Sequence, residues 1–228
     1  MRSDEEIPLL RGIVRVGDTV RRPLKPGADY VHALLGHFER SGFDGAPRFR
    51  GIDSQGREIL SFIEGFVPPH NGFRLDEDAV RAGARLIRRV HDLTEDTEFA
   101  AGFEVACHPN LSQPNFVFRD WKPVAIIDWD ETRPGNKVRN FGEFLWAFVH
   151  PAMYGDGESA ARMLQVAANA YGWPGGPLVD SMLDTVRAFQ DFVAGDRGAE
   201  EWAATELAYL EQNVDVFRAY LEGKKPLV

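Results

Sequence analysis

Apolar and polar positions alternate over residues 11–22 around Gly17 and Asp18, a pattern that predicts a β-hairpin. Residues 28–42 instead repeat apolar side chains at helical spacing, which predicts a helix with one buried face. Two β-rich runs then flank the turn-forming residues 53–56, so we expect a second hairpin there. These patterns predict a small N-terminal lobe, residues 1–66, made of strands and one helix.

The remaining chain, residues 67–228, is mostly helical in its periodicity, and a connector rich in proline and glycine (65–72) precedes it. Strands are expected at 115–119 and 123–128, on either side of a turn at residues 120–122. The helices expected are 76–91, 139–150, 158–171, 178–194 and 199–222. Together with the first lobe, this layout predicts an α+β fold of two lobes.

Composition narrows the function classes. Asp and Glu exceed Lys and Arg by 35 to 26, and a net charge of −9 argues against a duplex nucleic-acid partner. The single cysteine, Cys107, excludes an internal disulfide framework. No apolar run is long enough for a signal peptide or a membrane span, so we expect a cytoplasmic protein that does not contact a membrane. The sequence does not set the oligomeric state.

The most informative segment is residues 107–130, CHPNLSQPNFVFRDWKPVAIIDWD. It resembles the catalytic segment of the aminoglycoside phosphotransferase and choline kinase-like family, which reads His-Gly-Asp, four residues, Asn, a hairpin and then Ile-Asp-Trp. His108, Asn115 and Asp128 match the His, the Asn and the metal-binding Asp of that pattern. A smaller actinobacterial branch with trifolitoxin-immunity-like proteins is similar in three further segments: RRP (21–23), GIDSQGREILSFIEG (51–65) and RRVHDLT (88–94).

The resemblance implies a protein-kinase-like, two-lobed fold with a shortened N-terminal lobe and a mostly helical C-terminal lobe. It also implies phosphoryl transfer with ATP and Mg²⁺, since hard oxygen ligands neutralise the phosphate charge. On this interpretation Asp128 and Asn115 hold the metal with Asp130 as an auxiliary ligand, and His108 supports the loop. Arg21 or Arg22 takes the place of the family's strand lysine, and Arg22 either contacts phosphate or is a solvated strand residue.

The sequence departs from the pattern at the catalytic position, where Asn110 stands in place of the Asp and Pro109 in place of the Gly. An amide oxygen cannot accept a proton near neutral pH. Loss of a general base typically lowers the rate by about 10²–10⁴-fold, although positioning and electrostatics carry most of phosphoryl transfer. Asn110 therefore predicts weak or absent kinase activity and, if activity is retained, a residue that orients the acceptor.

Other departures concern the surroundings. Asn140 stands where the family has a structural Asp that opens a helix, and no Gly-rich loop precedes Arg22. Glu39, the only carboxylate well inside the first predicted helix, is the candidate for the acidic partner that the resemblance implies for Arg22, but we favour a solvated helix residue. Trp121 occupies a hairpin tip where Gly or Asn is usual, so we consider it an exposed contact residue. Structural alternatives remain open for Asp128, which could form a salt bridge, and for Asn115 and Asn110.

Three functions remain open, and with them whether the chain is an enzyme. The first is a diverged phosphotransferase that acts on a small metabolite in the interlobe cleft, with Mg²⁺ and ATP if the family activity is retained and no cofactor otherwise. The second is a catalytically inactive binding, immunity or regulatory protein linked to antibiotic or secondary metabolism. The third is a scaffold reused for other chemistry, with Asp128 or Asp130 as acid or base. All three imply a small-molecule ligand.

Overall fold

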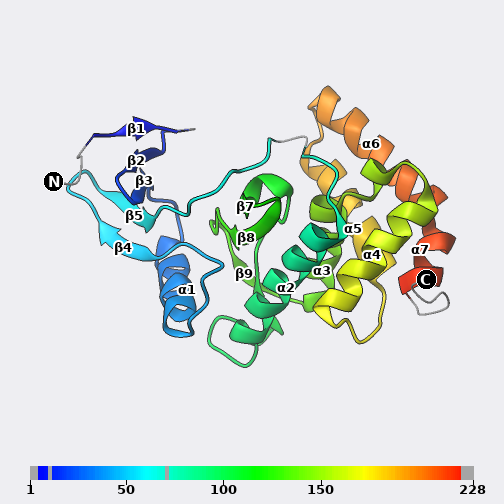
Figure 1. Cartoon of the computed structure of the whole chain (residues 1–228), viewed down its shortest axis with the longest axis horizontal. Coiled ribbons are helices and arrows are strands. Elements are labelled where there is room, and N and C mark those ends of the chain that lie inside the picture. The colour runs from blue at the N-terminus through cyan, green and yellow to red at the C-terminus, as the bar shows by residue number, and fades with distance from the viewer. Residues whose placement is uncertain (1–4, 10–11, 70–71, 222–228) are drawn as a thin grey trace.

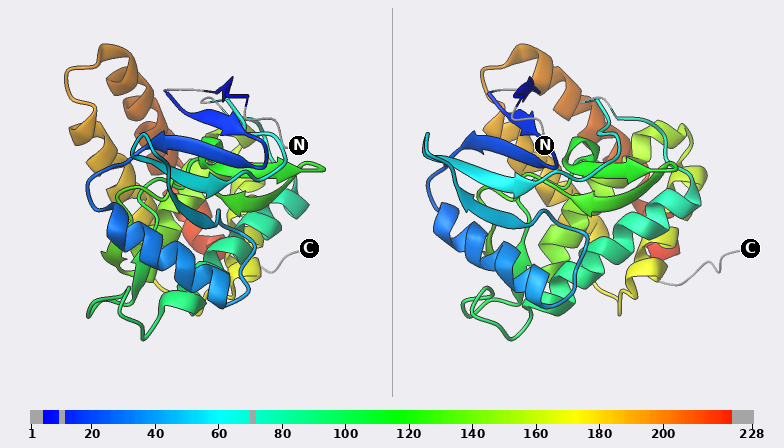
Figure 2. Two further views of the ribbon diagram at one scale, coloured as in Figure 1. Left: turned by 90° about the vertical axis from the view of Figure 1, so that its left-hand side faces the viewer. Right: turned by 60° about the vertical axis from the view of Figure 1, so that its left-hand side comes forward.

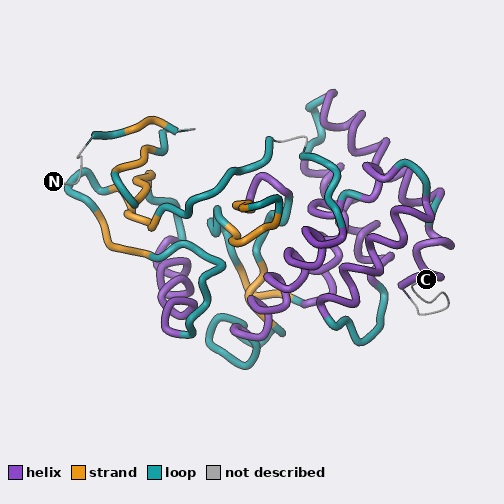
Figure 3. The backbone as a smooth tube through the Cα atoms, viewed as in Figure 1, coloured by secondary structure: helices purple, strands orange, loops and turns teal. Residues whose placement is uncertain are grey.

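The computed structural model of the chain describes residues 5–9, 12–69 and 72–221, and its strands and helices separate into two lobes (Figures 1 and 3). The N-terminal lobe is an antiparallel five-stranded sheet in the order β1-β2-β3-β5-β4, with helix α1 on one side of it (Figure 2). Its elements are β1 (Ile7–Pro8), β2 (Val14–Val16), β3 (Thr19–Pro23), α1 (Ala28–Arg40), β4 (Phe49–Ile52) and β5 (Arg57–Ser61).

Both predicted hairpins and the first predicted helix are present. Gly17 adopts a φ of 60° between β2 and β3, a left-handed conformation that glycine reaches without steric cost. Helix α1 buries its apolar stripe, Val31, Leu34, Leu35 and Phe38, in the core. Strand β3 positions the candidate site, because it pairs with β5 and places Arg22 directly opposite Glu58.

The C-terminal lobe is built mainly of helices that surround a shared aromatic and aliphatic core. Its helices are α2 (Glu77–Thr94), α3 (Lys137–Phe144), α4 (Gly157–Tyr171), α5 (Leu178–Phe192), α6 (Arg197–Gln212) and α7 (Val214–Leu221). Short turns complete it: 3₁₀ turns at Gln113–Asn115 and Pro151–Tyr154, and a π-helical turn at Leu145–Val149. Within the described residues, no helix combines the length and the apolar character that crossing a membrane requires.

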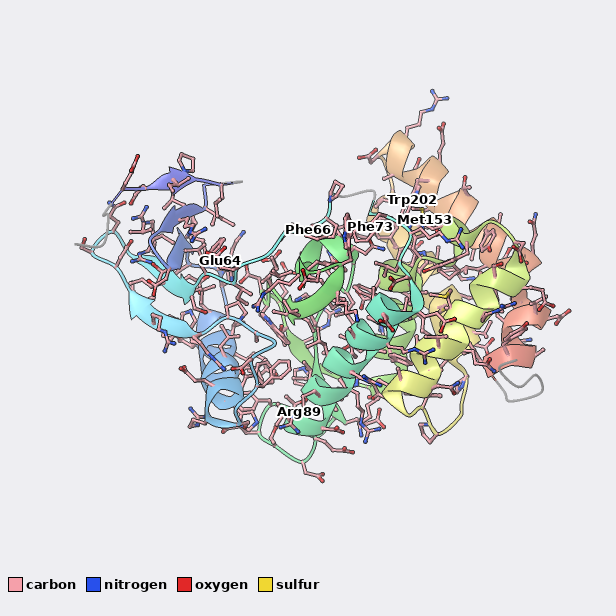
Figure 4. All side chains as sticks on the ribbon, viewed as in Figure 1. Glu64, Phe66, Phe73, Arg89, Met153 and Trp202 are labelled. Carbon is pink, nitrogen blue, oxygen red and sulfur yellow. The ribbon has the colours of Figure 1, made fainter. Side chains whose placement is uncertain are left out.

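Two antiparallel strand pairs lie between the sheet and the helices: β7 (Phe116–Arg119) with β8 (Lys122–Ile126), and β6 (Val105–Cys107) with β9 (Arg133–Gly135). The β7–β8 turn has Asp120 and Trp121 at φ 48° and 63°. Trp121 is 65% exposed, as expected for a hairpin tip. Its ring makes T-shaped contacts with those of Phe66 and Phe73. These two phenylalanines lie in and directly after the connector between the lobes (Figure 4).

Three sequence expectations about elements were wrong in detail. The helix expected over 199–222 is two helices that meet at Asn213, the C-cap of the first, which adopts a φ of −109°. The helix expected over 139–150 ends its regular part at Phe144 and continues as the π-helical turn. Strand β8 stops at Ile126, so Asp128 lies in the following loop and not at the end of the strand. The division of the chain at residue 66 stays a prediction.

Candidate functional site

Arg22 is the centre of a charge network at the junction of the lobes. Its side chain is only 10% exposed, and each of its three nitrogens donates to a different carboxylate. Nε contacts Glu58 Oε1 at 2.5 Å, Nη1 contacts Asp128 Oδ1 at 2.9 Å and Nη2 contacts Asp130 Oδ1 at 2.6 Å. Because Arg22 and Glu58 belong to the sheet while the two aspartates follow β8, one guanidinium connects the two lobes.

Glu58 is the partner of Arg22 that sequence reasoning missed. It is 2% exposed, lies opposite Arg22 in the β3–β5 register and accepts a second hydrogen bond from His32 Nε2 at 2.8 Å. Glu39, the candidate partner, instead pairs with Arg50 at the surface, 2.9 Å away. The signal that could have identified Glu58 is the pairing of the two predicted hairpins, because residues opposite each other in neighbouring strands interact directly.

The network carries three carboxylates against one guanidinium. Burial by itself would lower the pKa of Arg22, but Glu58, Asp130 and Asp128 outweigh it and raise that pKa. The pKa of Asp130 is raised, chiefly by burial and then by the charges of Asp128 and Glu58, while Arg22 works in the opposite direction. The guanidinium is therefore firmly charged and surrounded by more negative charge than it neutralises.

Asp128 has a strained backbone. Its φ is 62°, in the left-handed region that non-glycine residues seldom adopt, and such strain concentrates at functional sites. Trp129 next to it is buried and donates its ring N–H to Ile126 O at 2.8 Å, which holds the turn in place. The Asp128 side chain is 56% exposed, so its carboxylate reaches both Arg22 and solvent.

His108 supports the loop from within the core. Its Nε2 donates to Ile127 O at 3.0 Å, and its Nδ1 accepts the Asn110 backbone N–H at 3.2 Å. One nitrogen donates and the other accepts, which is the pattern of the neutral ring. Burial lowers the pKa of His108 to about 4, so the ring stays neutral and anchors the loop to the segment that leads into Asp128.

Asn110 and Asn115 are both engaged in local hydrogen bonds. Asn110 Oδ1 accepts the Ser112 backbone N–H at 3.1 Å, which closes an Asx-type turn. Asn115 Nδ2 donates to Asn110 O at 2.9 Å, and the Asn115 carbonyl accepts the Ile127 N–H at 2.8 Å. These hydrogen bonds fix the shape of the loop. At the position where the family pattern has a carboxylate as proton acceptor, the loop carries the amide of Asn110. The binding and catalytic roles predicted for Asn110 and Asn115 stay predictions.

Asn140 was expected to open a helix, and this was wrong. Asn136 occupies the N-cap of α3, whereas Asn140 is buried one turn inside it. Asn140 Nδ2 donates to His108 O at 2.8 Å, and its Oδ1 accepts from His91 Nε2 at 3.0 Å. The amide therefore serves as a bridge between helix α2 and the His108 loop, a role that a short linear motif does not reveal.

Two further side chains beside the loop escaped sequence reasoning. Glu143 Oε1 accepts the Leu111 N–H at 3.2 Å, and burial raises the pKa of this glutamate to about 7. Gln113 is buried and binds the backbone of Phe73 through both its amide atoms, and also Phe148 O at 3.0 Å. Neither residue belongs to a recognisable pattern, because their partners lie 32 to 40 positions away along the chain.

Comparison with known proteins places this geometry in context. In sequence, the chain is 32% identical over 174 residues to the trifolitoxin immunity protein of Rhizobium leguminosarum bv. trifolii. The match covers 67% of this chain and 65% of the relative, so the chain spans just under two thirds of that relative's length. No family model matches the chain.

Solved structures match over nearly the whole chain. A choline/ethanolamine kinase family protein from Mesorhizobium loti superposes with a TM-score of 0.59 at 14% identity, covering 96% of this chain and 90% of that one. An aminoglycoside phosphotransferase from Streptomyces rimosus, solved with ADP and streptomycin, gives 0.56 at 14% identity, covering 91% and 93%. The fold is that of the aminoglycoside phosphotransferases and choline kinases. The two-lobed α+β fold that the 107–130 motif implied is thereby confirmed.

Within this phosphotransferase-like fold, the expected metal ligands do not fit a metal ion as they stand. Asp128 and Asp130 each direct an oxygen to the Arg22 guanidinium, so a divalent ion between them would lie against a positive charge. With Arg22 in place, no group of three or more His, Cys, Asp and Glu side chains in the described part of the chain is arranged to hold a metal ion. The expected phosphate contact, Arg22, has every nitrogen bonded to a carboxylate of this chain.

Proposed function

We propose that this chain is a non-catalytic binding protein on a phosphotransferase-like scaffold, an immunity or regulatory protein that recognises a small metabolite or toxin. The observation that carries the proposal is the state of Asn110. The position of the family's proton acceptor holds an amide, and its oxygen accepts the Ser112 N–H. An amide has no basic oxygen to take a hydroxyl proton, so the step that the family motif implies has no acceptor at its usual place.

Two further observations support this proposal. Each of the three nitrogens of Arg22 donates to a carboxylate, Glu58, Asp128 or Asp130, so a phosphate group that approached the guanidinium would meet three negative charges already in place. The curated relative described above is named as an immunity protein. A protein that protects by binding needs a fixed recognition surface and no cofactor, and the tightly bonded His108–Asn115 loop suits that role.

The experiment expresses the chain in a trifolitoxin-sensitive strain and measures both survival and the chemical state of the toxin. We expect protection that scales with the amount of protein, with toxin recovered unmodified. Asn110→Asp should protect no better than the wild type, because protection by binding does not use a base. Recovery of a phosphorylated toxin, or no protection at any protein level, would overturn the proposal.

A second candidate is a phosphotransferase of reduced activity that uses ATP and Mg²⁺. It is favoured by the survival of Asp128 in a strained backbone conformation, with Asp130 two residues away and Asn115 on the preceding loop. In this case nucleotide binding would have to displace Arg22 from the two aspartates. Transfer of the γ-phosphate of labelled ATP to any hydroxyl compound, abolished by Asp128→Asn, would favour this candidate over the first.

A further inference from the structure

We propose that the Arg22 guanidinium is the permanent cation of the lobe junction, so that Asp128 and Asp130 bind no divalent metal in this chain. The inference starts from the disagreement between the metal site implied by the family motif and the contacts that these residues make. It does not depend on the proposed function, because an arginine-filled junction is compatible with a binding protein and with a metal-free transferase alike.

The geometry matches that of a two-carboxylate cation site. Asp128 Oδ1 and Asp130 Oδ1 each accept from a different terminal nitrogen of the same guanidinium, at 2.9 and 2.6 Å. Because the guanidinium is planar and rigid, it fixes these two oxygens side by side along its outer edge. A divalent ion held by the second oxygens of the same two aspartates would lie next to the guanidinium, and the positive charge of Arg22 would repel it.

The arginine is also held in place from behind. Nε donates to Glu58 Oε1 at 2.5 Å, and Glu58 is 2% exposed on the neighbouring strand. If Arg22 swung away, Glu58 would remain buried with His32 as its only side-chain partner among the described residues. Leaving a buried carboxylate without its cation is strongly unfavourable, so the guanidinium is not a mobile side chain that a weakly bound metal could displace.

The same charges predict what removal of the arginine would do. Glu58, Asp128 and Asp130 converge on one group, so an uncharged residue at position 22 leaves three carboxylates facing a common space. Convergent carboxylate oxygens are what hard divalent cations select. Replacement of Arg22 should therefore create a metal site that the native chain lacks.

The test is a titration of the full chain with Mn²⁺, followed by electron paramagnetic resonance of the free ion. Arg22→Met keeps an unbranched apolar side chain but removes the charge. Arg50→Met removes a surface arginine, which pairs with Glu39, and is the matched control. We expect the wild type and Arg50→Met to leave Mn²⁺ free, and Arg22→Met to bind one ion with a dissociation constant of about 10⁻⁴ M, typical of weak oxygen-ligand sites.

A second variant guards against a folding defect in Arg22→Met. Arg22→Lys keeps a positive charge, but a compact ammonium cannot contact all three carboxylates in the manner of a guanidinium. It should fold and bind Mn²⁺ more tightly than the wild type. The proposal is overturned if the wild type binds Mn²⁺ at about 10⁻⁴ M and loses it in Asp128→Asn, or if neither Arg22 variant binds more tightly than the wild type. None of these readouts uses phosphoryl transfer, so failure here is distinct from failure of the proposed function.

Discussion

Removal of Glu58 should destabilise the protein far more than removal of Glu39, the one candidate partner of Arg22 that the sequence offered. In Glu58→Ala, Arg22 Nε and His32 Nε2 both lose their acceptor in a region that is shielded from solvent. Because Arg22 keeps Asp128 and Asp130, the cost is that of hydrogen-bond donors left unsatisfied in this shielded region, about 1–3 kcal/mol for each of the two.

Glu39 provides the matched control. Its side chain is 40% exposed, and its partner Arg50 is also exposed, so the pair is worth at most about 1 kcal/mol. For a chain of this size each kcal/mol lowers the unfolding midpoint by about 2–4 °C. Glu58→Ala should therefore lower the midpoint by about 4–24 °C and Glu39→Ala by less than about 4 °C.

The assay is thermal unfolding followed by circular dichroism, with urea unfolding at 25 °C to give the free energy directly. The variant Glu58→Gln should fall between the two alanine variants, because it retains an oxygen for Arg22 Nε but loses the charge. The reasoning is refuted if Glu58→Ala and Glu39→Ala unfold within one degree of each other, or if Glu39→Ala is the less stable of the two.

The remaining predictions concern the core around the His108 loop. Burial lowers the pKa values of His91 and His108 to about 4, so the unfolded chain takes up protons first and the folded state should lose up to about 3 kcal/mol per histidine between pH 6.5 and 4. Urea unfolding across this range measures the loss. The loss of stability with falling pH should be steeper in Glu143→Gln, since the raised pKa of Glu143 stabilises the fold as the pH falls. A free energy of unfolding that does not change with pH would contradict this prediction. Asn140→Ala should cost about 2–4 kcal/mol by removing the partner of His91 Nε2 and of His108 O. The exposed cap Asn136→Ala should stay within about 0.5 kcal/mol, and equal losses would refute the bridging role of Asn140.

Local patterns predicted the elements well where one physical rule dominates. The stripe of Val31 and its neighbours defines α1, and the hairpin at Gly17 follows from turn chemistry. The apolar pattern failed to predict a helix boundary that is set by packing against other helices. Apolar periodicity continues through residue 213, yet the chain divides there, because the last turns of helix must reach different neighbours: α6 packs on α5 and α7 on α4.

In the candidate site too, the sequence predicted the residues of a local motif and missed the residues that distant contacts bring to it. The linear motif named Asp128, Asn115, His108 and Asn110, and its implied fold was confirmed; the catalytic and ligand-binding roles of these residues stay predictions. It did not name Glu58, Glu143 or Gln113, because each acts through partners distant in the chain. It also assigned Arg22 to phosphate, whereas the fold gives every nitrogen of that arginine a carboxylate, a fact that only the pairing of the lobes reveals.

The most direct test of the account is a single-turnover assay with the full chain in excess over γ-labelled ATP, in Mg²⁺ and with prolonged incubation. The account predicts neither hydrolysis nor transfer above a protein-free blank, because Asn110 cannot accept a proton and Arg22 occupies the two aspartates. Label released or transferred in a Mg²⁺-dependent manner by the wild type, and lost in Asp128→Asn, would contradict it.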